Sequence, residues 1–159
     1  MYLKIVFSLL SLFFYFGCTN TTPKMNNART AVSAATNSFR NVKYIANFDG
    51  DTVTVDIAGI PDVFGHNIPV RIRHIDTPEM KSSNKCEKEI AIKAKNIVHD
   101  ILKNAKQIDL EDVGRDKYFR ILARMIADGK DVGEYLITQR LAYKYEGETK
   151  LKINWCIKN

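Results

Sequence analysis

The chain has 159 residues, which is enough for one modest hydrophobic core and leaves little room for a second. Its 24 lysine and arginine residues outnumber 18 acidic residues, so the formal net charge at pH 7 is +6. This excess favours an anionic partner and leaves nucleic acid, a membrane surface and an acidic polymer open.

An almost unbroken apolar run from Ile5 to Phe16 is the first feature along the chain. Because it is too short to cross ~30 Å of hydrocarbon comfortably, it predicts a secretory signal peptide over residues 1–17. Cys18 follows at the start of a polar stretch, as at the processing site of a bacterial lipoprotein, where such a cysteine becomes the lipidated first residue. Ordinary cleavage near Ala34-Ala35 is the alternative. Both interpretations predict an exported domain, which is either anchored to a membrane or secreted.

Residues 18–39 are rich in Asn, Thr, Ala and Ser without hydrophobic periodicity, which predicts a flexible tether before a folded domain at 40–159. The folded part contains two cysteines, Cys86 and Cys156. In an exported protein such a pair favours a disulfide, and two free thiols are the alternative. A Cys-x-x-Cys motif is missing from the sequence, which argues against a zinc site.

The folded domain begins with two predicted strands. Val42 to Phe48 is apolar and aromatic, residues 49–51 are a turn signal, and Thr52 to Ile57 alternates between apolar and polar residues. Asp51 shares the parity of the apolar residues, so we expect its carboxylate to point toward the core. A charge buried there costs several kcal/mol unless a cation compensates it.

A turn-rich connection, Ala58 to Asn67, precedes the next predicted strand, Ile68 to Ile75, and Pro78 follows soon after its end. Arg71 and Asp76 are an odd number of residues apart, so strict alternation places them on opposite faces. If they share a site, the strand must bulge or bend between them.

The remaining elements include one long helix. Spacing of apolar residues predicts an amphipathic helix over Glu87 to Asn104. Next come a strand at Gln107 to Glu111, a charged loop at Val113 to Tyr118, a strand at Phe119 to Ile126 and a short helix at Val132 to Gln139. Five short strands with one long helix after the third predict an α+β fold, a small five-stranded OB-fold β-barrel with one long helix and one or more short helices.

Three segments, Phe48–Val53, Val70–Glu79 and Asp116–Arg120, resemble in order and spacing the signature segments of the staphylococcal nuclease (thermonuclease) family. The resemblance runs from about Val42 to Trp155. It implies an OB-fold nuclease that cleaves phosphodiester bonds of DNA and RNA with calcium and leaves 3′-phosphates.

The resemblance assigns Asp51, Asp76 and the backbone carbonyl of Thr77 to Ca²⁺. Carboxylate and carbonyl oxygens are the hard ligands that this ion requires. Asp49 is close enough to influence the charge of the site, although a role in forming the turn is the simpler interpretation.

Arg71 and Arg120 are the two catalytic arginines by resemblance, and a guanidinium can bind two phosphate oxygens at once. The family gives Glu79 the role of general base, either by taking a proton from water or by orienting it. A helix-start acid is its alternative role. The implied mechanism is in-line attack of a water on phosphorus, with the metal and both arginines stabilising the developing charge.

Four residues are candidates for contact with substrate. The motif supports Lys117 as a contact to the nucleic-acid backbone and Tyr118 as a ring that stacks on a base. Tyr143 and Tyr145 could do the same or could equally pack in the core. Phe119 stands where the family usually has glycine, which either alters the loop or adds a stacking surface.

Two other functions are compatible with the composition. One is a non-catalytic exported OB-fold module that binds nucleic acid, and the other is a lipoprotein domain that binds calcium only for stability. Neither needs the complete set of acids and arginines, so the set favours the enzyme. We infer no obligate protein partner from the sequence.

Overall fold

The structure is a computed structural model that describes residues 37–156. The signal peptide expected at 1–17, the lipidated Cys18 and nearly all of the expected tether lie outside the described residues.

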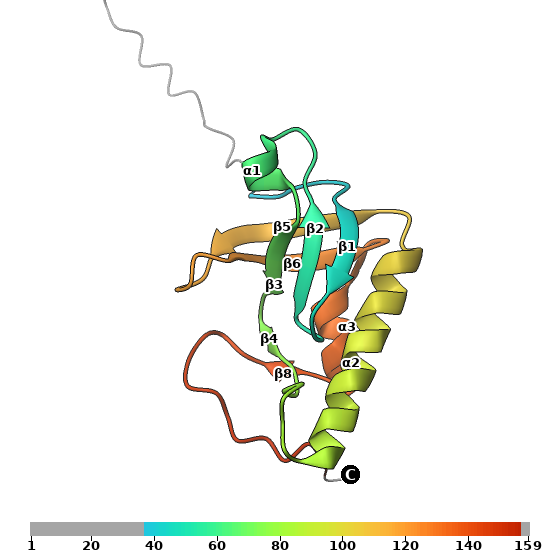
Figure 1. Cartoon of the computed structure of the whole chain (residues 1–159), viewed down its shortest axis with the longest axis vertical. Coiled ribbons are helices and arrows are strands. Elements are labelled where there is room, and N and C mark those ends of the chain that lie inside the picture. Colours follow the sequence, from blue (N-terminus) through green and yellow to red (C-terminus); the bar gives the residue numbers. More distant parts are fainter. Residues whose placement is uncertain (1–36, 157–159) are drawn as a thin grey trace, which may run out of the picture. The chain divides into compact units, whose positions relative to one another are not determined.

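A curled sheet forms the main part of the fold (Figure 1). Its strands follow the order β1-β2-β3-β6-β5, in which β3 and β6 are parallel and the other neighbours are antiparallel. Their bounds are Lys43–Asn47 (β1), Thr52–Asp56 (β2), Ile68–Ile72 (β3), Ile121–Ala127 (β6) and Ile108–Arg115 (β5). A short strand, β7 (Lys130–Asp131), pairs with β6.

The segment before β1 curls back onto β5. The amide of Phe39 donates to the carbonyl of Leu110 at 2.9 Å, and the amide of Val42 donates to that of Ile108 at 2.8 Å. These bonds link the two edges of the curled sheet, as the predicted OB-fold barrel requires. Residues 37–39, which we expected within the tether, are bonded to β5 and are therefore part of this barrel.

Alternation in β2 places the side chains as the sequence predicted. Val53 and Val55 are completely buried, while Thr52 and Thr54 are only partly buried. Val70, Leu110 and other apolar residues of the sheet join the same core. Asp51 continues the buried parity and is itself buried, as expected.

The long helix α2 (Lys85–Asn104) packs against β1, and its buried face consists of alanines, Val98 and Leu102. It begins two residues earlier than predicted because the side chain of Asn84 caps it. Asn84 Oδ1 accepts hydrogen bonds from the amides of Cys86, at 3.0 Å, and Glu87, at 3.3 Å. Such a cap satisfies amides that have no partner in the first helical turn.

The connections contain more regular structure than the sequence predicted. The turn-rich connection at 58–67 includes a short helix, α1 (Asp62–Gly65), which begins after Pro61, whose ring fixes its φ at −54°. The loop expected at Val113 to Tyr118 is strand in its first half, because a bulge between Glu111 and Gly114 adds one residue and lets β5 continue to Arg115.

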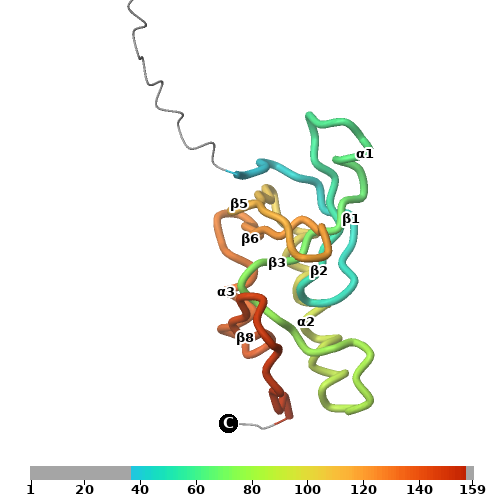
Figure 2. Tube along the Cα trace, turned by 90° about the vertical axis from the view of Figure 1, so that its left-hand side faces the viewer, coloured from blue at the N-terminus to red at the C-terminus, as the bar shows by residue number. Residues whose placement is uncertain are grey.

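The C-terminal part returns to the beginning of α2. After α3 (Val132–Thr138), strand β8 (Tyr143–Lys144) pairs with β4 (Ile75–Asp76). Residues 145–156 then run to a disulfide between Cys86 and Cys156, whose Cα atoms are 5.9 Å apart. Figure 2 shows β8 and this segment at the same end of the domain as the start of α2. Within residues 37–156, no helix has the length and apolar character needed to cross a membrane.

Candidate active site

A pocket of about 780 Å³ opens where β2, β3, β4 and the turn at 116–120 meet the segment after β8. It collects residues that are far apart in the sequence. Nine of the ten residues that were expected to bind metal, catalyse the reaction or contact substrate line it: Asp51, Arg71, Asp76, Thr77, Glu79, Lys117, Tyr118, Arg120 and Tyr145. The tenth, Tyr143, reaches the same site through a hydrogen bond to Asp76.

Asp51 is fixed by hydrogen bonds from two directions. Its Oδ2 accepts from the amide of Thr77 at 3.0 Å and from the Thr77 hydroxyl at 2.8 Å. On the other side, Asp49 Oδ1 accepts from the amides of Asp51, at 3.0 Å, and Thr52, at 2.7 Å. Asp49 therefore holds the turn that presents Asp51, which is the role that the simpler interpretation gave it.

Gly50 allows the first and second motifs to meet. A Cβ atom at this position would lie 2.9 Å from Ala94 Cβ on α2 and 2.9 Å from Thr77 Cγ2. Both distances are too short for carbon atoms. A glycine is therefore required between Asp49 and Asp51 because helix and backbone approach closely here.

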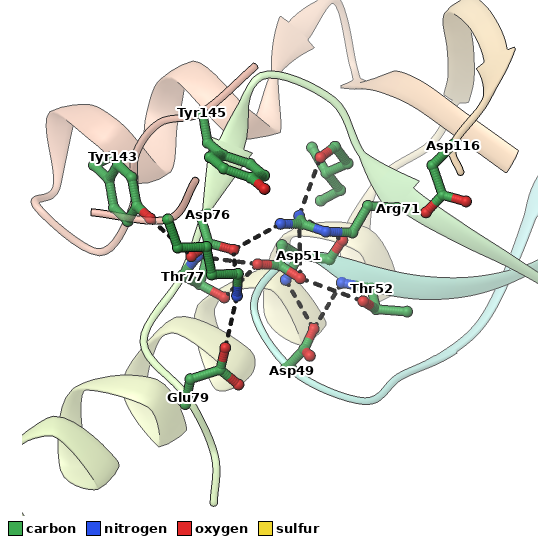
Figure 3. A network of polar contacts seen from close by, with 12 residues as sticks. Asp49, Asp51, Thr52, Arg71, Asp76, Thr77, Glu79, Asp116, Tyr143 and Tyr145 are labelled. Atoms are coloured by element: carbon green, nitrogen blue, oxygen red, sulfur yellow. Dashed lines mark hydrogen bonds and ion pairs between the residues drawn. The ribbon is translucent and has the colours of Figure 1, made fainter. Parts of the chain in front are cut away.

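Arg71 bridges the two buried carboxylates, as Figure 3 shows. Its Nη1 lies 3.1 Å from Asp51 Oδ1, and its Nη2 donates to Asp76 Oδ1 at 2.9 Å. The chain bends between Arg71 and Asp76, since β3 ends at Ile72 and His74 adopts a positive φ of 66° before β4 begins. This bend resolves the opposite strand parity that the sequence predicted for the pair.

The buried carboxylates carry more negative charge than Arg71 compensates. Burial raises the pKa of Asp51 to about 6, and the positive charge of Arg71 lowers it only in part, while Asp49 and Asp76 raise it further. An additional cation beside Asp51 would favour its ionised form. The site is therefore electrostatically suited to a positive ion.

Lys150 is a residue of the site that the sequence did not reveal. Its Nζ lies 2.7 Å from Glu79 Oε1 and 3.1 Å from Asp76 Oδ1. Burial alone would lower the pKa of Lys150, but its bonds to Glu79 and Asp76 outweigh this effect and raise it. The tail around Lys150 has no periodicity that predicts a position. Only its attachment through β8 and Cys156 brings it to the pocket.

Tyr143 completes the surroundings of Asp76. Its hydroxyl donates to Asp76 Oδ2 at 3.1 Å, and partial burial together with the nearby charge of Asp76 raises the pKa of Tyr143 to about 12. A tyrosine that remains protonated can keep donating this hydrogen bond. Tyr143 therefore positions a carboxylate, a role that the sequence did not predict.

Arg120 comes from a tight turn on the opposite side of the pocket. Asp116 Oδ2 accepts a hydrogen bond from Arg120 Nε at 2.7 Å, and Asp116 Oδ1 accepts from the amides of Tyr118 and Arg120. Within the described residues, the two Nη nitrogens of Arg120 make no hydrogen bond to protein. Arg120 thus has donors left for a phosphate, and Asp116 orients them.

The ligands expected for calcium are compatible with a hard cation. Asp51, Asp76 and Thr77 are buried at one end of the pocket and supply oxygen donors only. In residues 37–156, no group of three or more His, Cys, Asp or Glu side chains is arranged to hold a metal ion. The two carboxylates would accordingly need a backbone carbonyl and water to complete the coordination shell.

Comparisons with known proteins agree with the geometry. Endonuclease YncB of Bacillus subtilis (strain 168) is 36% identical over 134 residues, which cover 77% of this chain and 60% of the relative. The SPbeta prophage-derived endonuclease YokF of the same strain is 40% identical over 108 residues, which cover 64% of this chain and 34% of the relative. The matches thus span less than two thirds of the length of either relative.

A family model described as Staphylococcal nuclease homologue matches residues 69–154, more than half of the chain. Asp49, Asp51 and Thr52 precede the matched range, and the structure brings them into the pocket that the matched part lines. The order of the three motifs, the barrel and the family match lead to one conclusion: the chain belongs to the staphylococcal nuclease family.

Proposed function

We propose that this protein is a calcium-dependent nuclease that hydrolyses phosphodiester bonds of DNA and RNA. One observation carries the proposal: nine of the ten residues expected to bind metal, phosphate or bases line a single pocket, although they come from four separate parts of the chain. The names of the two Bacillus relatives, both endonucleases, support the same activity.

Asp51, Asp76 and the carbonyl of Thr77 would hold Ca²⁺, which would supply positive charge beside the phosphate. Arg71 contributes positive charge at the same end of the pocket, where the two carboxylates fix its guanidinium. Because Arg71 cannot relax away from them, its charge is preorganised before substrate binds.

Arg120 approaches the phosphate from the other side. Its Nη nitrogens can donate to two phosphate oxygens, and Asp116 keeps the guanidinium plane in place. Negative charge increases on these oxygens as water attacks phosphorus, so the two hydrogen bonds become stronger in the transition state than in the bound substrate.

Glu79 is the acid that orients the attacking water. Its side chain is exposed at the edge of the pocket, where water can reach it. Lys150 holds Oε1 of this carboxylate, which leaves Oε2 to accept a proton or a hydrogen bond from water. The expected 3′-phosphate products rest on the family resemblance and are tested by analysing the ends of the cleaved strands.

The test uses purified protein, plasmid DNA and an RNA transcript, with calcium or with a chelator. The variant Glu79→Gln should lose activity by about 100-fold or more, since general base catalysis contributes that much. Glu148→Gln is the matched control, because Glu148 lines the same pocket and the change is identical. Cleavage that is equal in wild type and Glu79→Gln would overturn the assignment of Glu79.

Two alternative results would point to other functions. A module that only binds nucleic acid would shift the mobility of DNA without cutting it. A domain in which calcium is structural would lose thermal stability in chelator and would not bind DNA. In either case intact substrate after incubation of the wild type with calcium would overturn the proposal.

We also propose that the protein is exported and tethered to a membrane through a lipidated Cys18. The apolar run at 5–16 and the disulfide between Cys86 and Cys156 support export. Mass spectrometry of the mature N-terminus should find a diacylglyceryl-modified Cys18. An unmodified terminus near Ala34-Ala35 would instead show ordinary secretion.

A further inference from the structure

An exposed apolar surface lies beside the turn at 116–120, away from the residues that bind metal. Val63 and Phe64 of α1 are 77% and 61% exposed, and Phe119 is 80% exposed. The three side chains line one shallow pocket of about 150 Å³ together with Arg115 and Arg120. Soluble domains keep few large apolar side chains this exposed side by side, and such groups often mark a binding surface.

Phe119 has an unusual backbone conformation in a hydrogen-bonded turn. Phe119 has a φ of +64°, which is rare for a bulky side chain. The turn is held by Asp116, which accepts hydrogen bonds from the amides on both sides of Phe119, and by Arg115, whose Nη1 donates to the Phe119 carbonyl at 2.7 Å. Hydrogen bonds therefore hold the turn that carries this exposed ring.

Positive charge surrounds the aromatic rings. Arg115 and Arg120 line the shallow pocket, and Lys117 Nζ lies 5.3 Å from the centre of the Tyr118 ring on the same turn. Alternation of aromatic rings with arginine and lysine is the pattern by which proteins bind single-stranded nucleic acid, the rings stacking on bases and the cations pairing with phosphates. The charge argues for a polyanion as the occupant.

The shallow pocket adjoins the candidate active site at one residue. Arg120 lines both the 780 Å³ pocket and the shallow pocket beside Phe119. A strand whose phosphate is bound by Arg120 can thus continue past the turn and onto the apolar surface. Only unpaired bases expose the faces needed for stacking, so the strand must be single-stranded there.

We propose that Phe64 and Phe119 form a stacking surface for an unpaired base beyond the scissile phosphate, so that KM is lower for a strand long enough to reach these two rings. This inference rests on the proposed nuclease function. The rings would contact a base and not the reacting phosphate, so they would bind ground state and transition state alike. Their loss should therefore raise KM and leave kcat unchanged.

The experiment compares wild type with the double variant Phe64→Ser and Phe119→Gly, in which glycine tolerates the positive φ. Phe48→Ser is the control, because Phe48 is 63% exposed and lines neither pocket. Steady-state cleavage is measured with a single-stranded 12-mer and with a dinucleotide that has one phosphodiester. The double variant should raise KM for the 12-mer by about tenfold. KM for the dinucleotide should stay within about twofold, and the control should match wild type for both.

A second measurement tests binding of the strand independently of its cleavage. Fluorescence anisotropy of the labelled 12-mer in chelator should show about tenfold weaker binding to the double variant even if no substrate is cleaved. If wild type cleaves nothing with calcium but this difference persists, the nuclease function fails and the surface stands. Unchanged binding and unchanged KM for the 12-mer would overturn the surface.

Two further measurements test whether the surface binds a membrane or a second copy of the protein instead. Co-sedimentation with vesicles of phosphatidylcholine and phosphatidylserine reports membrane contact, and sedimentation velocity reports contact with a second copy. Both should be equal for wild type and the double variant. If the double variant loses vesicle binding or dimers while its affinity for the 12-mer is normal, the surface has a different partner and the proposal is wrong.

Discussion

The ammonium group of Lys150 lies 2.7 Å from Oε1 of Glu79 and thereby ties the C-terminal segment to the acid expected to orient water. The same Nζ is 3.1 Å from Asp76, an expected ligand of calcium. Lys150 thus supplies positive charge at the place where a metal ion would supply it.

Replacing Lys150 by Gln should increase the affinity for Ca²⁺. The lysine competes for Asp76 and repels a nearby cation, and the loss of one such charge is worth about a tenfold change in affinity at the edge of a protein. Isothermal titration calorimetry measures this without relying on activity. Lys152→Gln removes the same charge from a residue that does not line the pocket, so its affinity should match wild type. Equal effects of both variants would show that only net charge matters.

Arg71 and Arg120 should differ in their importance for stability. Arg71→Met removes the guanidinium that the buried carboxylates of Asp51 and Asp76 share, which should cost about 3–5 kcal/mol. Arg120→Met breaks a partly exposed pair with Asp116 and should cost no more than about 1 kcal/mol. Both variants should lose cleavage by about 100-fold or more.

Urea unfolding in chelator measures the two stabilities, with far-UV circular dichroism as the signal. Similar losses for both arginines would contradict the structural role of Arg71. Calcium should restore part of the stability of Arg71→Met, since a second cation would compensate the same carboxylates.

The disulfide should stabilise both the domain and the pocket. It joins residues 70 positions apart, and a loop of that length contributes about 4 kcal/mol in the chain-entropy estimate. The double variant Cys86→Ser and Cys156→Ser should therefore unfold at lower urea concentration and have a raised KM, because the segment that includes Lys150 loses its anchor. Wild type treated with reductant should behave in the same way. If both retain full stability, the bond does not constrain the unfolded chain.

Asp109 should make the free energy of unfolding depend on pH in the acidic range. Burial alone would raise the pKa of Asp109, but hydrogen bonds from the Asn41 amide, Arg40 and Gln107 outweigh it and lower the pKa. A lowered pKa in the folded state means that the stabilisation is complete above the ordinary value of about 3.9. It is lost as the pH falls through the lower folded value.

Asp109→Asn should therefore cost about 1–3 kcal/mol near pH 7, and the difference from wild type should shrink below about pH 4. Urea unfolding at pH 7, 5, 4 and 3 measures this trend. Asp62→Asn, on the exposed α1, removes an equal charge and should leave the profile of wild type unchanged. A constant difference between Asp109→Asn and wild type at every pH would show that charge is not involved.

Alternation and helical spacing were sufficient to predict the elements that depend on local pattern. The burial of Val53 and Asp51 on one side of β2 and most of α2 follow from periodicities of two and 3.6 residues. The ends of the helices and strands were predicted less accurately. The bulge at Glu111 and Gly114 and the short helix α1 arise from backbone geometry that apolar spacing does not encode.

The sequence alone determined the chemistry of this protein: its acids, arginines and motifs, and hence its family. Tertiary structure decided which groups meet. The bend at His74 lets Arg71 reach Asp76, and the close approach of Gly50 to Thr77 brings the first two motifs together. The disulfide and the pairing of β8 place Lys150 beside Glu79. These are contacts between distant residues in an irregular backbone, so no local periodicity can reveal them.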